Sequence, residues 1–146
     1  MSRNGVNILL VEDNPQDAEL VIRALKTQNL ADQVKVARDG AEALDILFAP
    51  DQEGASLLEG LKVILLDLKL PKVSGLEVLR KIKAEVRTQS IPVVVLTSSP
   101  EESDVHECYH LGANSYIVKP LEFEEFTQAV AQLGTYWVQL NQTKPG

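Results

Sequence analysis

The 146-residue chain contains a single cysteine, Cys108, which excludes an internal disulfide and a metal site built from cysteine thiolates. No stretch approaches the roughly 20 apolar residues of a membrane-spanning helix, and the N-terminus has no signal-peptide hydrophobic region. Basic residues are also scarce, since 14 Lys and Arg stand against 21 Asp and Glu, for a net charge of −7. Such a chain is a poor partner for nucleic acid, because phosphate contacts need clustered Lys and Arg. We therefore expect a cytoplasmic protein that binds neither nucleic acid nor membrane.

The most informative segments that are present are apolar runs that end in carboxylates. Residues 63–66 run into Asp67, and residues 8–11 run into Glu12 and Asp13. A continuous apolar run is typical of a strand that is buried on both faces of a parallel sheet. Because ligands bind at the carboxyl edge of such sheets, the three carboxylates are expected at one site.

Two further apolar runs deliver a polar group to the same edge. Residues 93–96 end in Thr97, and residues 115–118 end in Lys119. Clustered carboxylates repel one another, so their ionised form requires a cation, and an all-oxygen donor set favours a hard divalent ion such as Mg²⁺. A lysine and a hydroxyl beside that ion suit the remaining oxygens of a phosphoryl group. The pattern predicts a phosphoryl-transfer site in which one carboxylate is the nucleophile.

Strand-like and helix-like spacings alternate along the chain, which predicts parallel βαβ units and a doubly wound α/β fold. Residues 34–37 are less apolar than the other strands and are expected at an edge of the sheet. Asn14 and Pro15 are the residue types favoured at the N-cap and first position of a helix. The turn-rich segment 50–56 is interpreted as a surface insertion, with a recognition element as the alternative. Helical spacing is found over residues 15–28, from Asp39-Gly40 to Leu47, and over residues 74–86.

Taken together, these residues resemble the receiver domains of two-component response regulators. The resemblance spans about residues 6–133 and implies a flavodoxin-like fold, in which five parallel strands in the order 2-1-3-4-5 carry helices on both faces. The length predicts one domain over residues 1–146, with residues 134–146 as a C-terminal extension and no room for a separate output domain. The narrower similarity is to the single-domain response regulators of bacterial phytochromes. The motifs that carry the resemblance are, in chain order, Glu12-Asp13, Asp67, Leu70-Pro71, Ser74-Gly75, Thr97-Ser98, Tyr116 and Lys119-Pro120.

The resemblance implies a role for each residue of the predicted site. Asp67 is expected to accept the phosphoryl group, because it stands alone at the end of the central strand. Asp13 is expected to bind Mg²⁺ directly and Glu12 through a water, with the backbone carbonyl of Lys69 as the third protein ligand. Lys119 is expected to pair with a phosphoryl oxygen. The residues alone leave two alternatives, in which Glu12 and Asp13 are charged caps of the next helix and Lys119 is solvated.

A hydroxyl and an aromatic residue form the predicted switch. Thr97 is expected to donate its hydroxyl to the phosphoryl group, which leaves a gap that Tyr116 fills by rotating inward. The alternative for Tyr116 is an ordinary half-buried strand residue. Two residues depart from the commonest receiver pattern. Lys69 replaces a smaller or polar residue and puts the lifetime of the phosphoaspartate in doubt, whereas Ser74 replaces an aspartate and is expected to cap a helix.

The C-terminal segment repeats apolar residues in steps of three and four, among them Phe126, Val130, Trp137 and Leu140. Trp137 and Leu140 extend past the domain and leave apolar surface that needs a cover. We interpret this segment, the strand 115–118 and the helix before that strand as a homodimer face. The alternative is a tail that folds back onto its own domain.

These expectations describe a stand-alone response regulator of a phosphorelay, which takes a phosphoryl group from a histidine kinase, with a phytochrome as the candidate kinase. It is expected to signal through a conformational change at the predicted homodimer face. It is not expected to be an enzyme, beyond slow loss of its own phosphoryl group. The alternative is a pseudo-receiver that acts only as an interaction module, which the intact site argues against. An aspartyl phosphatase is disfavoured by Lys69, which stands where those enzymes place a second aspartate. A flavodoxin-like cofactor binder is disfavoured because no glycine-rich phosphate loop follows the first predicted strand of this chain.

Overall fold

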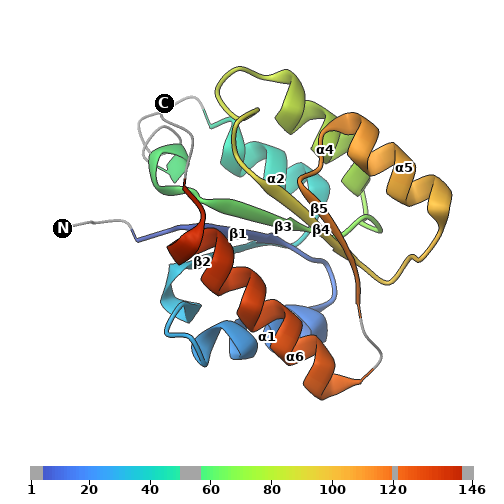
Figure 1. Cartoon of the computed structure of the whole chain (residues 1–146). Coiled ribbons are helices and arrows are strands. Elements are labelled where there is room, and N and C mark those ends of the chain that lie inside the picture. The colour runs from blue at the N-terminus through green and yellow to red at the C-terminus, as the bar shows by residue number, and fades with distance from the viewer. Residues whose placement is uncertain (1–4, 50–56, 120–121, 143–146) are drawn as a thin grey trace.

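Five parallel strands form the centre of the molecule, in the order β2-β1-β3-β4-β5 (Figure 1). This is the predicted fold class and the predicted strand order. The computed structural model describes residues 5–49, 57–119 and 122–142. The turn-rich segment 50–56 lies outside the described residues, so its interpretation as an insertion stays a prediction. The strands are Ile8–Val11 (β1), Val34–Ala37 (β2), Val63–Leu66 (β3), Val93–Thr97 (β4) and Ser115–Val118 (β5).

Helices cover both faces of the sheet. Figure 1 shows α1 and α6 on one face and α2, α4 and α5 on the other. Within the described ranges, no helix combines the length and the apolar character needed to cross a lipid bilayer. The helices are Pro15–Lys26 (α1), Gly40–Leu47 (α2), Gly75–Ala84 (α4), Glu102–Leu111 (α5) and Phe123–Gly134 (α6), with a 3-10 turn at Ala31–Gln33 (η1) and a π-helical segment at Thr135–Leu140 (η2).

The three inner strands are buried along their whole length, as their continuous apolar runs predicted. One hydrophobic cluster lies between the sheet and the α1 and α6 layer, and a second lies between the sheet and the α2, α4 and α5 layer. β2 is partly exposed at one edge of the sheet, in agreement with its weaker apolar character. Burying one large aliphatic side chain stabilises a fold by about 1.5–3 kcal/mol. The buried sheet is therefore a stable base for the polar residues at its carboxyl edge.

The parallel register sets Glu12 and Asp67 side by side. β1 and β3 pair with Val11 opposite Leu66, so the next residue of each strand leaves the sheet at the same level. The backbone N–H of Asp67 continues the ladder by donating to the Val11 carbonyl at 3.1 Å. Strand pairing thus brings together two carboxylates that are far apart in the sequence.

Side-chain caps fix the helix starts near this edge. The Asn14 side chain accepts hydrogen bonds from the first turn of α1, at 2.9 and 3.1 Å, and Pro15 is the first helical residue. The Ser74 hydroxyl accepts the backbone N–H of Glu77 at 3.2 Å and caps α4, as predicted. Such caps stabilise a helix by about 1 kcal/mol each. They set the direction in which α1 and α4 leave the carboxyl edge.

The C-terminal helix continues through Gly134 into η2 without a break. Phe126 is 5% exposed and Val130 is fully buried, because both pack between α6, α1 and the sheet. The prediction that these two residues lie at an interface is corrected, since the chain's own core covers them. Trp137 packs against the edge of the same cluster, whereas Leu140 is 70% exposed.

Candidate functional site

Three carboxylates converge at the carboxyl edge of the sheet. Glu12, Asp13 and Asp67 each place one oxygen within 4.8 Å of the others. Glu12 is 3% exposed and Asp67 is 9% exposed, whereas Asp13 faces solvent. The structure thus brings together the three acidic residues selected from the sequence. Charged capping of α1 accounts for none of this convergence with Asp67, which comes from a different strand.

Lys119 follows β5, and its ammonium lies among carboxylates. Its Nζ donates to Glu12 Oε1 at 2.9 Å, to Asp17 Oδ2 at 3.1 Å and to Asp67 Oδ2 at 3.3 Å. The Lys119 side chain is only 11% exposed, so it is not a solvated lysine at a strand end. Sequence reasoning missed Asp17, which lies in the first turn of α1.

Burial and neighbouring charges together shift the pKa values of Glu12 and Lys119. Burial raises the pKa of Glu12 from 4.5 to about 7, and the charge of Asp67 adds to this, while the bond to Lys119 offsets part of it. Burial opposes the ammonium of Lys119, but Glu12 and Asp67 outweigh it and raise the lysine's pKa above its ordinary value. Lys83 is a useful contrast, because among the described residues its Nζ donates only to two backbone carbonyls and an asparagine side chain, and burial lowers its pKa to about 8. The carboxylates therefore keep Lys119 charged.

The carboxylate cluster fits a hard divalent cation. All of its donors are oxygens, which is the donor set that Mg²⁺ and Mn²⁺ prefer. Glu12 Oε2 accepts the backbone N–H of Asn14 at 3.2 Å, and Asp67 Oδ1 accepts that of Lys69 at 3.3 Å, so both carboxylates are held in orientation by the backbone. In the described part of the chain, no other cluster of three His, Cys, Asp or Glu residues has this geometry.

Comparison with known proteins decides the family. The family model for the response regulator receiver domain matches residues 8–131, which is most of the chain. The chain belongs to the receiver domains of response regulators.

Three relatives show which receivers it is similar to. It is 43% identical over 139 residues to the probable methanogenesis regulatory protein FilR2 of Methanothrix harundinacea, covering 95% of this chain and 87% of the relative. The phosphorylated cyanobacterial phytochrome response regulator RcpA has a TM-score of 0.86 and 35% identity, covering 96% of this chain and 99% of that one. The Mn²⁺-bound form of Rcp1, a response regulator of Synechocystis, has a TM-score of 0.85 and 36% identity, with coverage of 96% and 99%. The receiver is thus similar to phytochrome response regulators and to a relative that holds a divalent metal.

In this receiver, the loop after Asp67 is packed tightly against backbone. The N–H of Gly75 donates to the Leu68 carbonyl at 2.9 Å, and a methyl group on Gly75 would overlap the backbone of Asp67 and Leu68. Gly40 has a similar close contact, because a methyl group there would overlap the Val73 carbonyl. The backbone at Asp67 is therefore held by the start of α4, and this close approach leaves room only for a glycine at residue 75.

The predicted switch residues meet at Ser99. Thr97 is fully buried, and its Oγ1 accepts the backbone N–H of Ser99 at 3.4 Å. The half-buried Tyr116 donates its hydroxyl to the Ser99 carbonyl at 2.8 Å, and the Ser99 hydroxyl donates to Asp104 of α5 at 2.6 Å. Within the described residues, Thr97 makes no hydrogen bond to Asp67. Sequence reasoning missed Ser99 and Asp104, which connect the ends of β4 and β5 to α5.

Proposed function

We propose that this receiver is a stand-alone response regulator that accepts a phosphoryl group on Asp67 from a histidine kinase. The observation that carries the proposal is the convergence of Glu12, Asp13 and the Lys119 ammonium on Asp67, with Lys119 Nζ 3.3 Å from its Oδ2. FilR2 and RcpA, which the chain covers over 87% and 99% of their lengths, support a regulator formed by the receiver alone. RcpA also supports a phytochrome as the kinase. Because a histidine kinase takes its phosphoryl group from ATP, we propose that the transfer to this receiver takes place in the cytoplasm.

Asp67 supplies the nucleophile of the transfer. One of its carboxylate oxygens attacks the phosphorus of a phosphohistidine, and the O–P bond forms as the N–P bond breaks. The imidazole keeps the electron pair of the broken bond and takes up a proton. Lys119 stays within reach of a phosphoryl oxygen. Its ammonium offsets the negative charge of that oxygen and so stabilises the transition state of the transfer.

We propose Mg²⁺ as the metal, because the donor oxygens are hard ligands and the negative charge of the carboxylates exceeds the positive charge of Lys119. When bound, Mg²⁺ supplies charge neutralisation at the phosphoryl oxygens. Asp13 and Asp67 would hold it directly, Glu12 through a water, and the backbone carbonyl of Lys69 would complete the protein ligands. The Lys69 side chain is exposed beside the acceptor, where it can screen the phosphoaspartate from water and slow its hydrolysis.

The Thr97, Ser99 and Tyr116 contacts support the proposed output. A Thr97 hydroxyl that turns toward a phosphoryl oxygen releases the backbone N–H of Ser99 and disturbs the carbonyl that accepts Tyr116. Because the Ser99 hydroxyl also binds Asp104, this local change reaches α5. An interaction module that works without phosphorylation is the second candidate, and it would use the same α5, β5 and α6 face.

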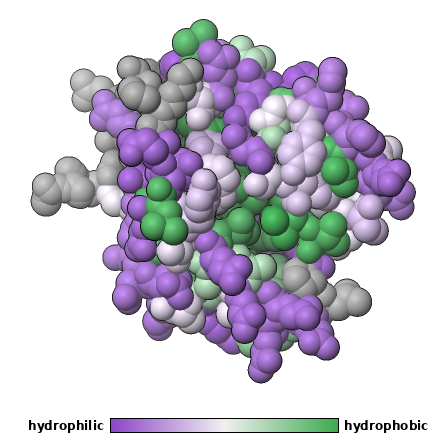
Figure 2. Space-filling view, in the orientation of Figure 1, coloured by the Kyte–Doolittle hydropathy of each residue, from purple (hydrophilic) through white to green (hydrophobic). Residues whose placement is uncertain are grey.

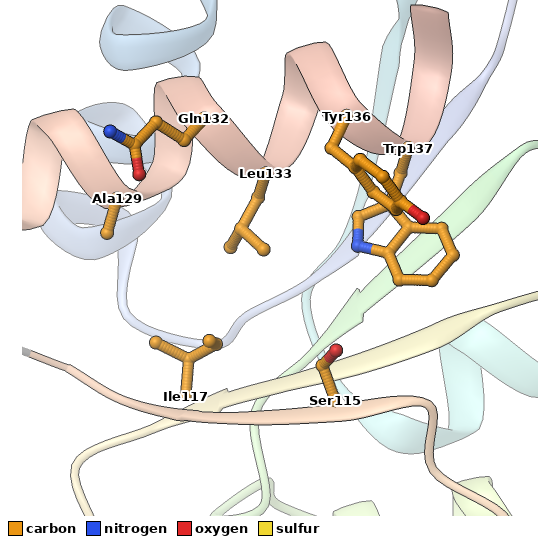
Figure 3. Close-up of a pocket in the computed structure, with 7 residues that line it drawn as sticks. All are labelled: Ser115, Ile117, Ala129, Gln132, Leu133, Tyr136 and Trp137. Atoms are coloured by element: carbon orange, nitrogen blue, oxygen red, sulfur yellow. The ribbon is translucent and has the colours of Figure 1, made fainter. Parts of the chain in front are cut away.

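We also propose that this face joins two copies of the chain. Figure 2 shows hydrophobic residues gathered between α5 and α6, where β5 forms an edge of the sheet. A hollow of about 330 Å³ lies there, between the β5 residues Ser115 and Ile117 and the α6–η2 residues around Leu133 and Trp137 (Figure 3). Leu140 is exposed and lines a neighbouring hollow of about 320 Å³, which shares Tyr136 with the first. A second copy is a suitable cover, since two-fold pairing matches one such edge with another.

The first test is the intact mass of the full chain after incubation with Mg²⁺ and acetyl phosphate, with and without EDTA. We expect one Mg²⁺-dependent phosphoryl adduct, which Asp67→Asn removes while the fold is retained. Asp45→Asn is the matched control, because Asp45 is an exposed aspartate on α2. An Asp67→Asn variant labelled as fully as the wild type would overturn the acceptor assignment. A folded, Mg²⁺-binding wild type that takes up no phosphoryl group from this donor or from a cognate kinase would favour the interaction module.

A further inference from the structure

Asp17 is a fourth carboxylate at the site, and no role described so far accounts for it. It lies in the first turn of α1, and its Oδ2 accepts a hydrogen bond from Lys119 Nζ at 3.1 Å. Its side chain is 37% exposed, so it sits at the rim of the cluster, whereas Glu12 and Asp67 are buried.

Two ordinary roles for an aspartate in this position are already filled by other groups. An acid in the first helical turn can cap the backbone N–H of the N-cap residue, but the N–H of Asn14 donates to Glu12 Oε2 at 3.2 Å. An acid near a metal site can be a ligand, but the candidate metal cluster in the described residues consists of Glu12, Asp13 and Asp67. The contact of Asp17 with Lys119 is therefore its distinguishing feature.

The three hydrogen bonds of Lys119 differ in what happens to their acceptors. An ammonium has three N–H donors, and here they are directed at Glu12, Asp17 and Asp67 at 2.9, 3.1 and 3.3 Å. Glu12 and Asp67 are also expected to engage the metal, and Asp67 changes chemically when it takes the phosphoryl group. Asp17 is the hydrogen-bond partner of Lys119 that stays unchanged through these steps.

We propose that Asp17 is a positioning residue, which holds the Lys119 ammonium at the site while Glu12 and Asp67 exchange partners. This inference rests on the proposed function. Lysine has four rotatable bonds, and restricting them before the reaction removes an entropic cost from the transition state. The loss of this restraint is expected to slow phosphoryl uptake about tenfold, which is the size of the rotamer entropy of one lysine.

The test compares Asp17→Ala, Asp17→Asn and Glu19→Ala in the full chain. Glu19 is on the same helix and pairs with Arg23 at its exposed surface, so its variant controls for the lost charge. At saturating Mg²⁺ and acetyl phosphate, Asp17→Ala is expected to take up phosphoryl groups about tenfold more slowly than wild type. Asp17→Asn keeps an oxygen acceptor and is expected to retain at least about a third of the wild-type rate. Mn²⁺ affinity, measured by electron paramagnetic resonance, is expected to change by less than about threefold in both variants, because Asp17 is not a metal ligand.

A second readout is independent of phosphorylation. In carbon-edited NMR spectra, a fixed lysine gives two distinct signals for its ε-methylene protons, and Lys119→Met identifies those of Lys119. We expect distinct signals in wild type, Asp17→Asn and Glu19→Ala, and merged signals in Asp17→Ala. Signals that stay distinct in Asp17→Ala, or an Asp17→Asn variant as slow as Asp17→Ala, would refute the positioning role. A wild type that takes up no phosphoryl group would overturn the proposed function instead, and the NMR signals would still decide whether Asp17 fixes Lys119.

Discussion

Glu12→Gln is expected to remove a pH dependence from the stability of the metal-free receiver. Glu12 is 3% exposed, and burial raises its pKa from 4.5 to about 7. Between these two values, the folded state holds a proton that the unfolded chain has released, so the stability of the wild type falls as pH rises. Glutamine has no titratable group and keeps an oxygen that can accept the Lys119 hydrogen bond. The variant should therefore lack this part of the slope.

The size of the effect follows from the two pKa values of Glu12. One pKa unit corresponds to about 1.4 kcal/mol of free energy. Integrating the folded and unfolded titrations between about pH 5 and about pH 7.5 gives a loss of about 2 kcal/mol for the wild type relative to the variant. Domains are stable by about 5–15 kcal/mol, so a change of this size is easily measured. All other titratable groups are common to both proteins, and their contributions cancel to first order in the difference.

Urea unfolding followed by circular dichroism, in EDTA at the two pH values, measures this difference. Glu19→Gln is the matched control, because Glu19 is exposed on α1 and should give the wild-type slope. Metal binding requires ionised carboxylates, so Mg²⁺ should stabilise the wild type more at the higher pH. Equal pH slopes for wild type and Glu12→Gln would refute the reasoning, since they would mean that Glu12 titrates alike in the folded and unfolded states.

Two further predictions concern the loop between Asp67 and Gly75 and the proposed dimer face. Gly75→Ala should destabilise the protein by about 3 kcal/mol or more, because the methyl group would overlap backbone atoms that cannot give way. In the same urea assay, Gly134→Ala should stay within about 1 kcal/mol of wild type, because its methyl group meets the ends of leucine side chains and alanine favours the helix. Similar losses of stability in both variants would contradict the packing argument. Leu140→Asp should weaken self-association about tenfold or more in sedimentation equilibrium, whereas Val86→Asp, at another exposed apolar residue, should not. A wild type that is monomeric at all concentrations would remove the dimer proposal.

Much of the site could be predicted from the sequence because strand burial and register are simple constraints. The apolar runs before Glu12 and Asp67 had to be inner strands, and parallel pairing then left little choice about where their carboxylates would lie. The helix caps at Asn14 and Ser74 were predictable for a similar reason, since a cap is a local interaction between residues a few positions apart.

The features that sequence reasoning missed depend on how elements pack against each other. Asp17 has the sequence environment of any acid in a first helical turn, and only the placement of α1 beside the end of β5 brings it to Lys119. In the same way, the spacing of Phe126 and Val130 fits a partner interface as well as a core helix. The packing of α6 on α1 decides for the core, because it leaves no exposed surface on Val130.

The location of Asp17 at the rim of the site also limits the electrostatic cost of its proposed role. The site holds four carboxylates and one ammonium, so it has a formal charge of −3 when Glu12 is ionised, and a divalent cation would bring this to −1. A fully buried fourth acid would add strong repulsion against an incoming phosphoryl group. Because the Asp17 side chain is 37% exposed, solvent screens its charge, while the 3.1 Å hydrogen bond to Lys119 is kept. This location lets Asp17 orient the ammonium with little repulsion at Asp67. Asp17→Asn should therefore change phosphoryl uptake far less than Asp17→Ala, whereas a mainly electrostatic role would affect both variants alike.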